Sequence, residues 1–213
     1  MSPISPIIKV CGMREAENIR EVESIGIDLM GFIFWPKSSR YVSERPAYLP
    51  TNCSRVGVFV NEDIEQIKRT AHDYGLNLIQ LHGSESPDFC QEVHQQTGLK
   101  IIKAISIDKC SMFNRQCSIY EGIADYFLFD TKGKSYGGNG TQFDWDILQH
   151  YKGDTPFLLS GGIGPDDAGR LRHWHHPQCI GFDINSRFEL ERGIKDTDKI
   201  KTFINTLRQY EPY

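Results

Sequence analysis

Two reactive side chains stand where an apolar run of the sequence ends. Cys11 follows the run Ile7–Val10 and precedes Gly12, and Asp130 follows the run Tyr126–Phe129. A thiolate at the start of a helix is stabilised by backbone amide dipoles, so Cys11 could act as a base or a nucleophile. The alternative is a buried cysteine that behaves as a small hydrophobic residue. Asp130 could act as a general acid, or its carboxylate could cap the following loop.

Glycines follow a third apolar run, Phe157–Leu159, in the sequence Ser160-Gly161-Gly162-Ile163-Gly164. Glycine lets the backbone approach a ligand closely, and a turn with free amides can cradle an anion. Gly161 and Gly162 could therefore bind a phosphate, or they could simply form a tight turn. Farther along, the stretch Asp183–Arg187 could begin a short helix whose amides face the same spot.

Arg40 could recognise a carboxylate. It follows Lys37-Ser38-Ser39, and its guanidinium presents a fork of N–H donors that matches the two oxygens of a carboxylate. The alternative is an ordinary surface arginine.

Short apolar runs rich in β-forming residues recur along the chain, with amphipathic stretches between them. The eight runs are 7–10, 29–34, 56–60, 78–81, 101–105, 126–129, 157–159 and 180–184. Apolar strands without alternation are typical of parallel sheets covered on both faces, and eight βα units close most naturally into a barrel. The sequence therefore predicts an α/β fold, a single (βα)8 TIM barrel over residues 1–213. An open doubly wound sheet is the rival, but the turn after the first strand lacks the Gly-x-Gly-x-x-Gly pattern.

The stretches between the runs are predicted to form helices. They are 14–24, 63–74, 86–97, 108–120, 144–151, 165–173 and 196–210. Asn61 or Asp63 can cap one of them, and Ser86 followed by Pro87 suits the start of the next. Prolines in the segment 43–52 predict that the helix of the second unit is short, displaced or missing.

In a barrel of this kind the functional site is built at the C-terminal ends of the strands. That rule gathers the candidates at one rim: Cys11, Arg40, Asn61, His82, Ala104, Asp130, Ser160 and Asp183. Phosphate binding after strands seven and eight recurs in such barrels, which favours the phosphate interpretation of the glycine turn. The glycine-rich stretch 131–142 is interpreted as a mobile lid. Its Gly133-Lys134-Ser135 imitates a nucleotide-binding loop, but Leu128 stands where the earlier glycine is required.

Composition narrows the classes of partner. The formal net charge of −4 gives no broad basic field for nucleic acid or anionic lipid. The longest apolar run, 29–35, is far below the ~20 residues of a membrane helix. Six cysteines without a Cys-x-x-Cys pair suit free thiols in a reducing cytoplasm, and Cys90 with His94 lacks the further ligands that zinc needs. We expect a cytoplasmic protein, with no metal, membrane or nucleic-acid partner, that binds a small phosphorylated molecule.

Nearly the whole chain resembles the phosphoribosylanthranilate isomerase family of tryptophan biosynthesis. The residues that carry the resemblance are Lys9-Val10-Cys11-Gly12-Met13, Gly31-Phe32-Ile33-Phe34, Ser39-Arg40-Tyr41-Val42, Gly57-Val58-Phe59-Val60-Asn61, Gln80-Leu81-His82-Gly83, Asp130, Gly137-Gly138-Asn139-Gly140, Phe143-Asp144-Trp145, Ser160-Gly161-Gly162-Ile163 and Gly181-Phe182-Asp183. Their joint order at matching strand ends is specific to the family.

The resemblance implies a cofactor-free Amadori rearrangement of N-(5-phosphoribosyl)anthranilate, carried out by an intramolecular oxidoreductase of the aldose-ketose type. Asp130 would be the general acid that opens the furanose ring, and Cys11 the general base that removes the proton from sugar C2. Arg40 would hold the anthranilate carboxylate.

The resemblance also implies the remaining substrate contacts. Amides around Gly161, Gly162 and Ser186 would hold the phosphate, with His82 and Asp183 beside the substrate. Arg187 stands where the family usually has glycine, so its side chain could add charge to the phosphate site or the turn could differ. A ribulose-phosphate epimerase and a non-catalytic phosphate-ligand binding protein are the rivals, and either a monomer or a homodimer is expected.

Overall fold

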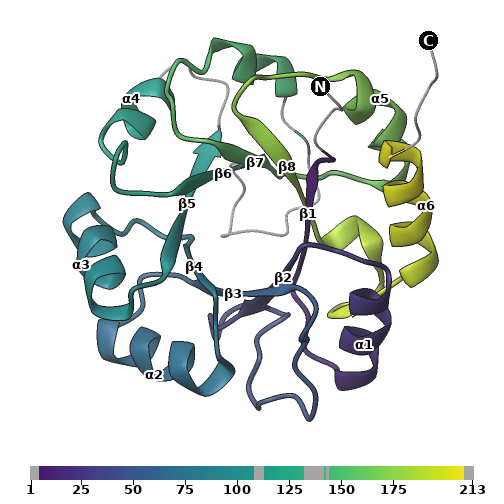
Figure 1. Cartoon of the computed structure of the whole chain (residues 1–213), viewed down its shortest axis with the longest axis horizontal. Coiled ribbons are helices and arrows are strands. Elements are labelled where there is room, and N and C mark those ends of the chain that lie inside the picture. The colour runs from purple at the N-terminus through teal and green to yellow at the C-terminus, as the bar shows by residue number, and fades with distance from the viewer. Residues whose placement is uncertain (1–4, 108–112, 132–141, 143, 209–213) are drawn as a thin grey trace.

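The computed structural model describes residues 5–107, 113–131, 142 and 144–208. Its eight parallel strands form a closed barrel in which each strand pairs with its neighbours in the chain, and the last pairs with the first. The strands are β1 (Ile7–Cys11), β2 (Leu29–Ile33), β3 (Ser54–Phe59), β4 (Leu78–Leu81), β5 (Lys100–Ile107), β6 (Tyr126–Thr131), β7 (Phe157–Leu159) and β8 (Cys179–Ile184). The predicted (βα)8 barrel is confirmed, with the strands in a ring and the helices around its outside (Figure 1).

Helices occupy most of the predicted stretches. The α-helices are α1 (Ala16–Ser24), α2 (Ile64–Tyr74), α3 (Pro87–Thr97), α4 (Phe113–Ser118), α5 (Ala168–His173) and α6 (Thr197–Arg208). Two of the predicted caps are present: Asp63 accepts hydrogen bonds from the Glu65 and Gln66 amides, and Ser86 accepts one from the Phe89 amide. These side chains satisfy amides that a helix N-terminus leaves unpaired.

Three predicted helices differ from the structure. The stretch 144–151 forms a 3-10 helix, η1 (Trp145–His150), and 165–173 is divided into a 3-10 turn, η2 (Pro165–Asp167), followed by α5. The Asp144 side chain accepts from the Asp146 amide, two residues on, which suits the tighter winding of a single 3-10 segment. Of the stretch 108–120 only α4 is helical, and residues 108–112 lie outside the described residues.

The β2 to β3 connection contains no helix between Ile33 and Ser54, as its prolines predicted. Instead the carboxylate of Glu23, on α1, accepts hydrogen bonds from the Thr51 and Asn52 amides and from the Tyr48 hydroxyl. A single buried carboxylate therefore organises backbone groups that a helix would otherwise have satisfied.

Apolar side chains pack on both faces of the barrel strands. The inner layer lies inside the barrel and consists of Val56, Leu78, Ile102, Ala104, Leu128 and Leu158. The outer layer packs the opposite strand faces against the helices. Because side chains alternate along a strand, the inward positions continue toward the C-terminal rim. Leu128 is thus followed inside the barrel by Asp130, and Leu78 by Gln80 and then His82.

Two short strands after β8 were not predicted from the sequence. They are β9 (Glu189–Glu191) and β10 (Ile194–Lys195), paired antiparallel, and they follow the 3-10 turn η3 (Ser186–Phe188). The expected short helix after β8 is therefore this 3-10 turn. Asn18, on α1, fastens the hairpin through both backbone groups of Lys195, at 2.9 Å to the carbonyl and 2.7 Å from the amide.

Candidate active site

The Cys11 thiol, at the end of β1, lies beside a buried ion pair. Lys9 points into the barrel two residues before it, and its ammonium donates to Asp183 Oδ1, at the end of β8, at 2.8 Å. Ser160, after β7, donates from Oγ to the other carboxylate oxygen of Asp183 at 3.2 Å. All four residues are buried. The C-terminal ends of β7, β8 and β1 thus share one polar network.

Burial and charge act in opposite directions on this thiol. Burial raises the pKa of Cys11, because a thiolate loses solvation inside the protein, whereas the Lys9 ammonium lowers it. For Lys9 itself, burial opposes the charge, but the carboxylate of Asp183 and the thiol of Cys11 prevail and raise its pKa. Lys9 therefore stays charged, and it is the nearest source of stabilisation for a thiolate at position 11.

Asp130 lies on β6 at the same rim. Its Oδ1 accepts from the Thr131 amide at 2.8 Å, and its Oδ2 lies 3.4 Å from His82 Nε2, at the end of β4. Gln80 Nε2 lies 2.7 Å from the other ring nitrogen of His82 and fixes the orientation of the ring. The structure thus brings the predicted residues Asp130 and His82 together.

The glycine turn after β7 lies directly against Asp130. Gly161 and Gly162 have φ values of +88° and +72°, a region that favours glycine. A Cβ at Gly161 would lie 2.4 Å from Thr131 Oγ1 and 3.3 Å from Asp130 Oδ1. A side chain at this position would therefore press on the candidate acid.

If the Gly161 amide binds a phosphate, as the sequence predicts, Gly161→Ala should raise KM on the order of 10-fold, the effect of losing about one charge-assisted hydrogen bond. The left-handed conformation costs a non-glycine residue about 1–2 kcal/mol, so Tm should also fall. Gly169→Ala in α5 is the matched control, because a Cβ there meets nothing within 4 Å. Steady-state kinetics and thermal melting of both variants test this, and an unchanged KM in Gly161→Ala would exclude a close backbone approach to the substrate.

Ser186 and Arg187 lie on η3, next to the β7 turn. A Cβ at Gly164 would lie 3.0 Å from Arg187 Cδ, so the stem of this arginine passes over the turn. The Gly164 amide donates to Asp167 Oδ2 at 2.7 Å and is already engaged. Phosphate binding by the amides of Gly161 and Gly162 stays a prediction. Of the predicted lid, 131–142, residues 132–141 lie outside the described residues.

Arg40 is not an ordinary surface arginine, since it is only 9% exposed. Its Nε and Nη2 donate to the two carboxylate oxygens of Glu189 at 2.7 and 2.6 Å. The Lys195 ammonium, also buried, lies 2.8 Å from Glu189 Oε1. Burial lowers the pKa of Lys195 to about 8, although Glu189 acts in the opposite direction. A Cβ at Gly12 would lie 2.6 Å from Arg40 Cδ, so this glycine leaves the path of the arginine open beside Cys11.

The sequence analysis missed Lys9, Glu189 and Lys195 as residues of the site. Lys9 had a usable signal, because a lysine within an apolar strand, two residues before a candidate nucleophile, shares its face. Glu189 and Lys195 had none, since their strands are too short for a periodic pattern.

The described residues contain no cluster of three or more potential metal ligands. They also contain no helix long and apolar enough to cross a membrane.

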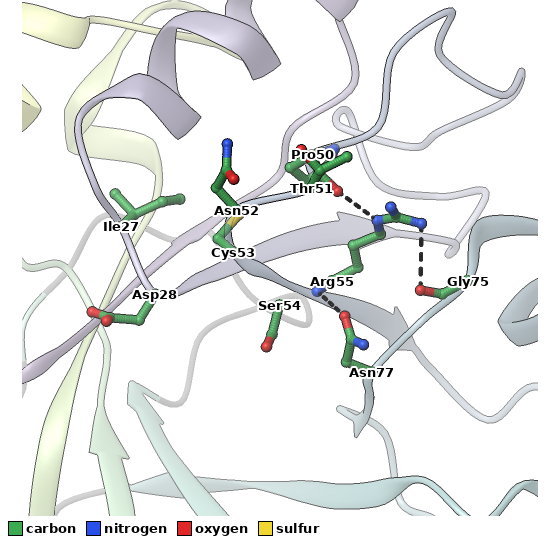
Figure 2. Close-up of a pocket in the computed structure, with 10 residues that line it drawn as sticks. All are labelled: Ile27, Asp28, Pro50, Thr51, Asn52, Cys53, Ser54, Arg55, Gly75 and Asn77. Atoms are coloured by element: carbon green, nitrogen blue, oxygen red, sulfur yellow. Dashed lines mark hydrogen bonds between the residues drawn. The ribbon is translucent and has the colours of Figure 1, made fainter.

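A polar pocket of about 450 Å³ lies at the opposite rim, where β2, β3 and β4 begin. Figure 2 shows Arg55 within it, donating to the backbone carbonyls of Pro50 and Gly75 while its own amide donates to Asn77. Residues at this rim of a barrel serve stability, and this arginine joins the loops beneath β3. The pocket is separate from the rim of Cys11 and Asp130.

Known proteins resemble this chain both in sequence and in fold. Residues 8–206 match the family model described as N-(5'phosphoribosyl)anthranilate (PRA) isomerase. The chain belongs to the phosphoribosylanthranilate isomerase family. An N-(5'-phosphoribosyl)anthranilate isomerase of Phocaeicola vulgatus is 53% identical over 203 residues, covering 95% of this chain and 98% of that protein.

Solved structures of the phosphoribosylanthranilate isomerase family share the barrel. The Thermotoga maritima enzyme has a TM-score of 0.82 at 33% identity, with 95% of this chain and 98% of that chain covered. Another isomerase structure, with a TM-score of 0.79 at 30% identity and the same coverage, is a complex with reduced 1-(o-carboxyphenylamino)-1-deoxyribulose 5-phosphate.

Proposed function

We propose that this isomerase converts N-(5-phosphoribosyl)anthranilate to 1-(2-carboxyphenylamino)-1-deoxyribulose 5-phosphate in tryptophan biosynthesis. It would act as an intramolecular oxidoreductase of the aldose-ketose type, because sugar C1 is reduced while C2 is oxidised. The observation that supports this best is the convergence of Cys11 and Asp130 on one rim. A continuous set of contacts joins them, from Lys9 through Asp183 and Ser160 to the glycine turn beside Asp130.

Asp130 acts as the general acid in this proposal. Its carboxyl group gives a proton to the furanose ring oxygen, the bond from that oxygen to C1 breaks, and the nitrogen lone pair forms an iminium with C1. His82, 3.4 Å from Asp130, holds the carboxyl group in position. Ring opening is thus promoted by a buried acid that touches both the β4 end and the glycine turn.

Cys11 acts as the general base on the open-chain iminium. The thiolate takes the C2 proton, the freed electron pair forms a C1–C2 double bond, and the iminium nitrogen becomes neutral. The resulting enolamine tautomerises to the ketone. Burial disfavours the thiolate in the free protein, so Lys9 and the positive iminium supply the charge that stabilises it. Because each step is a proton transfer, the proposed mechanism uses no cofactor.

The proposed substrate carries two anionic groups, a carboxylate and a phosphate, and different residues bind each of them. We infer that Arg40 recognises the anthranilate carboxylate, and that the amides of Gly161, Gly162 and Ser186 recognise the phosphate. Asp183 keeps Lys9 in place through their ion pair. A phosphorylated biosynthetic intermediate as substrate also favours a cytoplasmic location.

The test is to mix the purified protein with freshly made phosphoribosylanthranilate and follow the loss of substrate fluorescence. We expect the unmodified protein to accelerate the loss of fluorescence. A protein substituted at both Cys11 and Asp130 should give only the spontaneous rate. A folded, unmodified protein that binds the substrate but gives only the spontaneous rate would favour the non-catalytic phosphate-ligand binding protein instead.

A further inference from the structure

Arg40, the proposed partner of the substrate carboxylate, belongs to a buried charge cluster whose other members have no role in the proposed mechanism. Its members are Arg40 from the β2 to β3 connection, Glu189 from β9 and Lys195 from β10. Glu189 is the hub: its two oxygens accept from Arg40 at 2.7 and 2.6 Å, and Oε1 also accepts from Lys195 at 2.8 Å. The Gly193 amide donates to the same oxygen at 3.1 Å.

The cluster leaves donors of Arg40 available on one side. A guanidinium has five N–H bonds, and the contacts with Glu189 involve only Nε and Nη2. With both of these nitrogens held, the plane of the guanidinium is fixed, so its remaining N–H bonds keep a set direction. A carboxylate approaching that side would meet donors already oriented, without the entropy loss of ordering a free arginine.

The charges of the cluster do not cancel. Two cations, Arg40 and Lys195, share the single carboxylate of Glu189, and Asn185 supplies a neutral acceptor to Lys195 at 2.6 Å. The other ionisable groups facing the cluster are Cys11, whose thiol interacts with both cations, and the pair of Lys9 with Asp183 beside it. Burial of excess positive charge is costly unless an anion compensates it. A carboxylate bound at Arg40 would supply that anion.

We propose that Glu189 is a positioning residue that, with Lys195, holds Arg40 in the orientation that recognises the carboxylate of the substrate's aryl amine. The β9–β10 hairpin is then the element that selects a carboxylated substrate. This inference rests on the proposed function, since it takes the carboxylate of anthranilate as the partner of Arg40.

Glu189→Gln tests positioning because it keeps the length of the side chain and replaces the carboxylate with an amide. Glu189 is the main group that raises the pKa of Lys195, so its removal also leaves the ammonium of Lys195 less strongly held. The amide of glutamine can accept at one atom only, so the two-point hold on the guanidinium is lost. Orientation of Arg40 is therefore the property that changes.

The measurement is the dissociation constant, by calorimetry, of two non-reacting ligands. One is reduced 1-(o-carboxyphenylamino)-1-deoxyribulose 5-phosphate, and the other is its phenyl counterpart without the carboxyl group. We expect Glu189→Gln to raise the dissociation constant of the carboxylated ligand on the order of 10-fold. The dissociation constant of the phenyl ligand should stay within about twofold of its value for the unmodified protein. The two ligands are titrated into separate portions of the same protein preparation, so any inactive fraction affects both measurements equally.

Glu191→Gln is the matched control, because Glu191 lies on the same short strand but is exposed. It should preserve the preference of the unmodified protein for the carboxylated ligand. Glu189→Asp, which keeps the charge, should retain part of that preference and provides a second variant should Glu189→Gln fold poorly.

Equal weakening of both ligands in the Glu189 variants would mean that the cluster is only structural, and an unchanged or increased preference for the carboxylated ligand would also overturn positioning. If the unmodified protein bound neither ligand, the proposed function would fail before the inference was reached.

Discussion

Cys11→Ala is expected to lower kcat by about 10²–10⁴-fold, the contribution of one general base. In the proposed mechanism the thiolate of Cys11 accepts the C2 proton. Alanine removes this group without adding a new contact. The cost in stability should be about 1 kcal/mol, as for many buried substitutions, and should shift Tm by about 2–4 °C. Steady-state kinetics at saturating substrate, together with thermal melting, give both values.

Cys90→Ala is the control for Cys11→Ala. Cys90 is equally buried but lies on α3, outside the site, and burial raises its pKa to about 11. It should keep kcat unchanged. Cys11→Ser should lose nearly as much activity as Cys11→Ala, because a hydroxyl does not ionise in the accessible pH range. Turnover near the unmodified rate in Cys11→Ser would contradict a thiolate base.

The pH profile offers a further readout of the same residue. The base works as the thiolate, and burial raises the pKa of Cys11, so kcat/KM of the unmodified protein should rise as pH increases above neutrality. This rising limb should be missing from the residual activity of Cys11→Ala. A limb that persisted unchanged would assign the titration to another group.

Asp130→Asn is expected to reduce kcat by a similar factor, about 10²–10⁴-fold. An asparagine keeps the shape of the side chain and can still accept from the Thr131 amide, but it has no acidic proton for the ring oxygen. Folding should therefore change little while ring opening slows. Single-turnover measurement of substrate fluorescence would locate the loss in the chemical step.

Asp125→Asn is the matched control, at the opposite end of the same strand. The Asp125 carboxylate accepts from the Ile101 amide at 2.8 Å, at the N-terminal rim of the barrel and away from the site. This variant should have the unmodified kcat. If Asp130→Asn retained the unmodified kcat as well, the acid would have to be another residue, and His82 would be the next to substitute.

Much of the fold could be predicted because its signals are local. Each strand is a short apolar run, such as 78–81, and the predicted run coincides with β4. Helix starts at Asp63 and Ser86 could be predicted because a cap acts on amides two or three residues away. The weak points were segments such as 144–151, where the choice between an α-helix and a 3-10 helix depends on tertiary packing rather than on the local pattern.

The candidate site could be predicted only in part. Cys11 and Asp130 stand at the ends of recognisable strands, so a rule about barrel rims finds them. The partners of Arg40 could not be found in this way, because Glu189 is 149 residues from Arg40 in the chain. Only the folded barrel, and an irregular hairpin after β8, brings such charges together.

Closure of the barrel between β1 and β8 has a consequence for synthesis. Cys11, the proposed base, lies on the first barrel strand to leave the ribosome, while Asp183, the counter-ion of Lys9, lies on the last barrel strand. A nascent chain that ends before β8 holds Lys9 without its carboxylate and leaves one edge of β1 unpaired, a state open to aggregation. The polar network around Cys11 is therefore completed late in synthesis, when β8 pairs with β1.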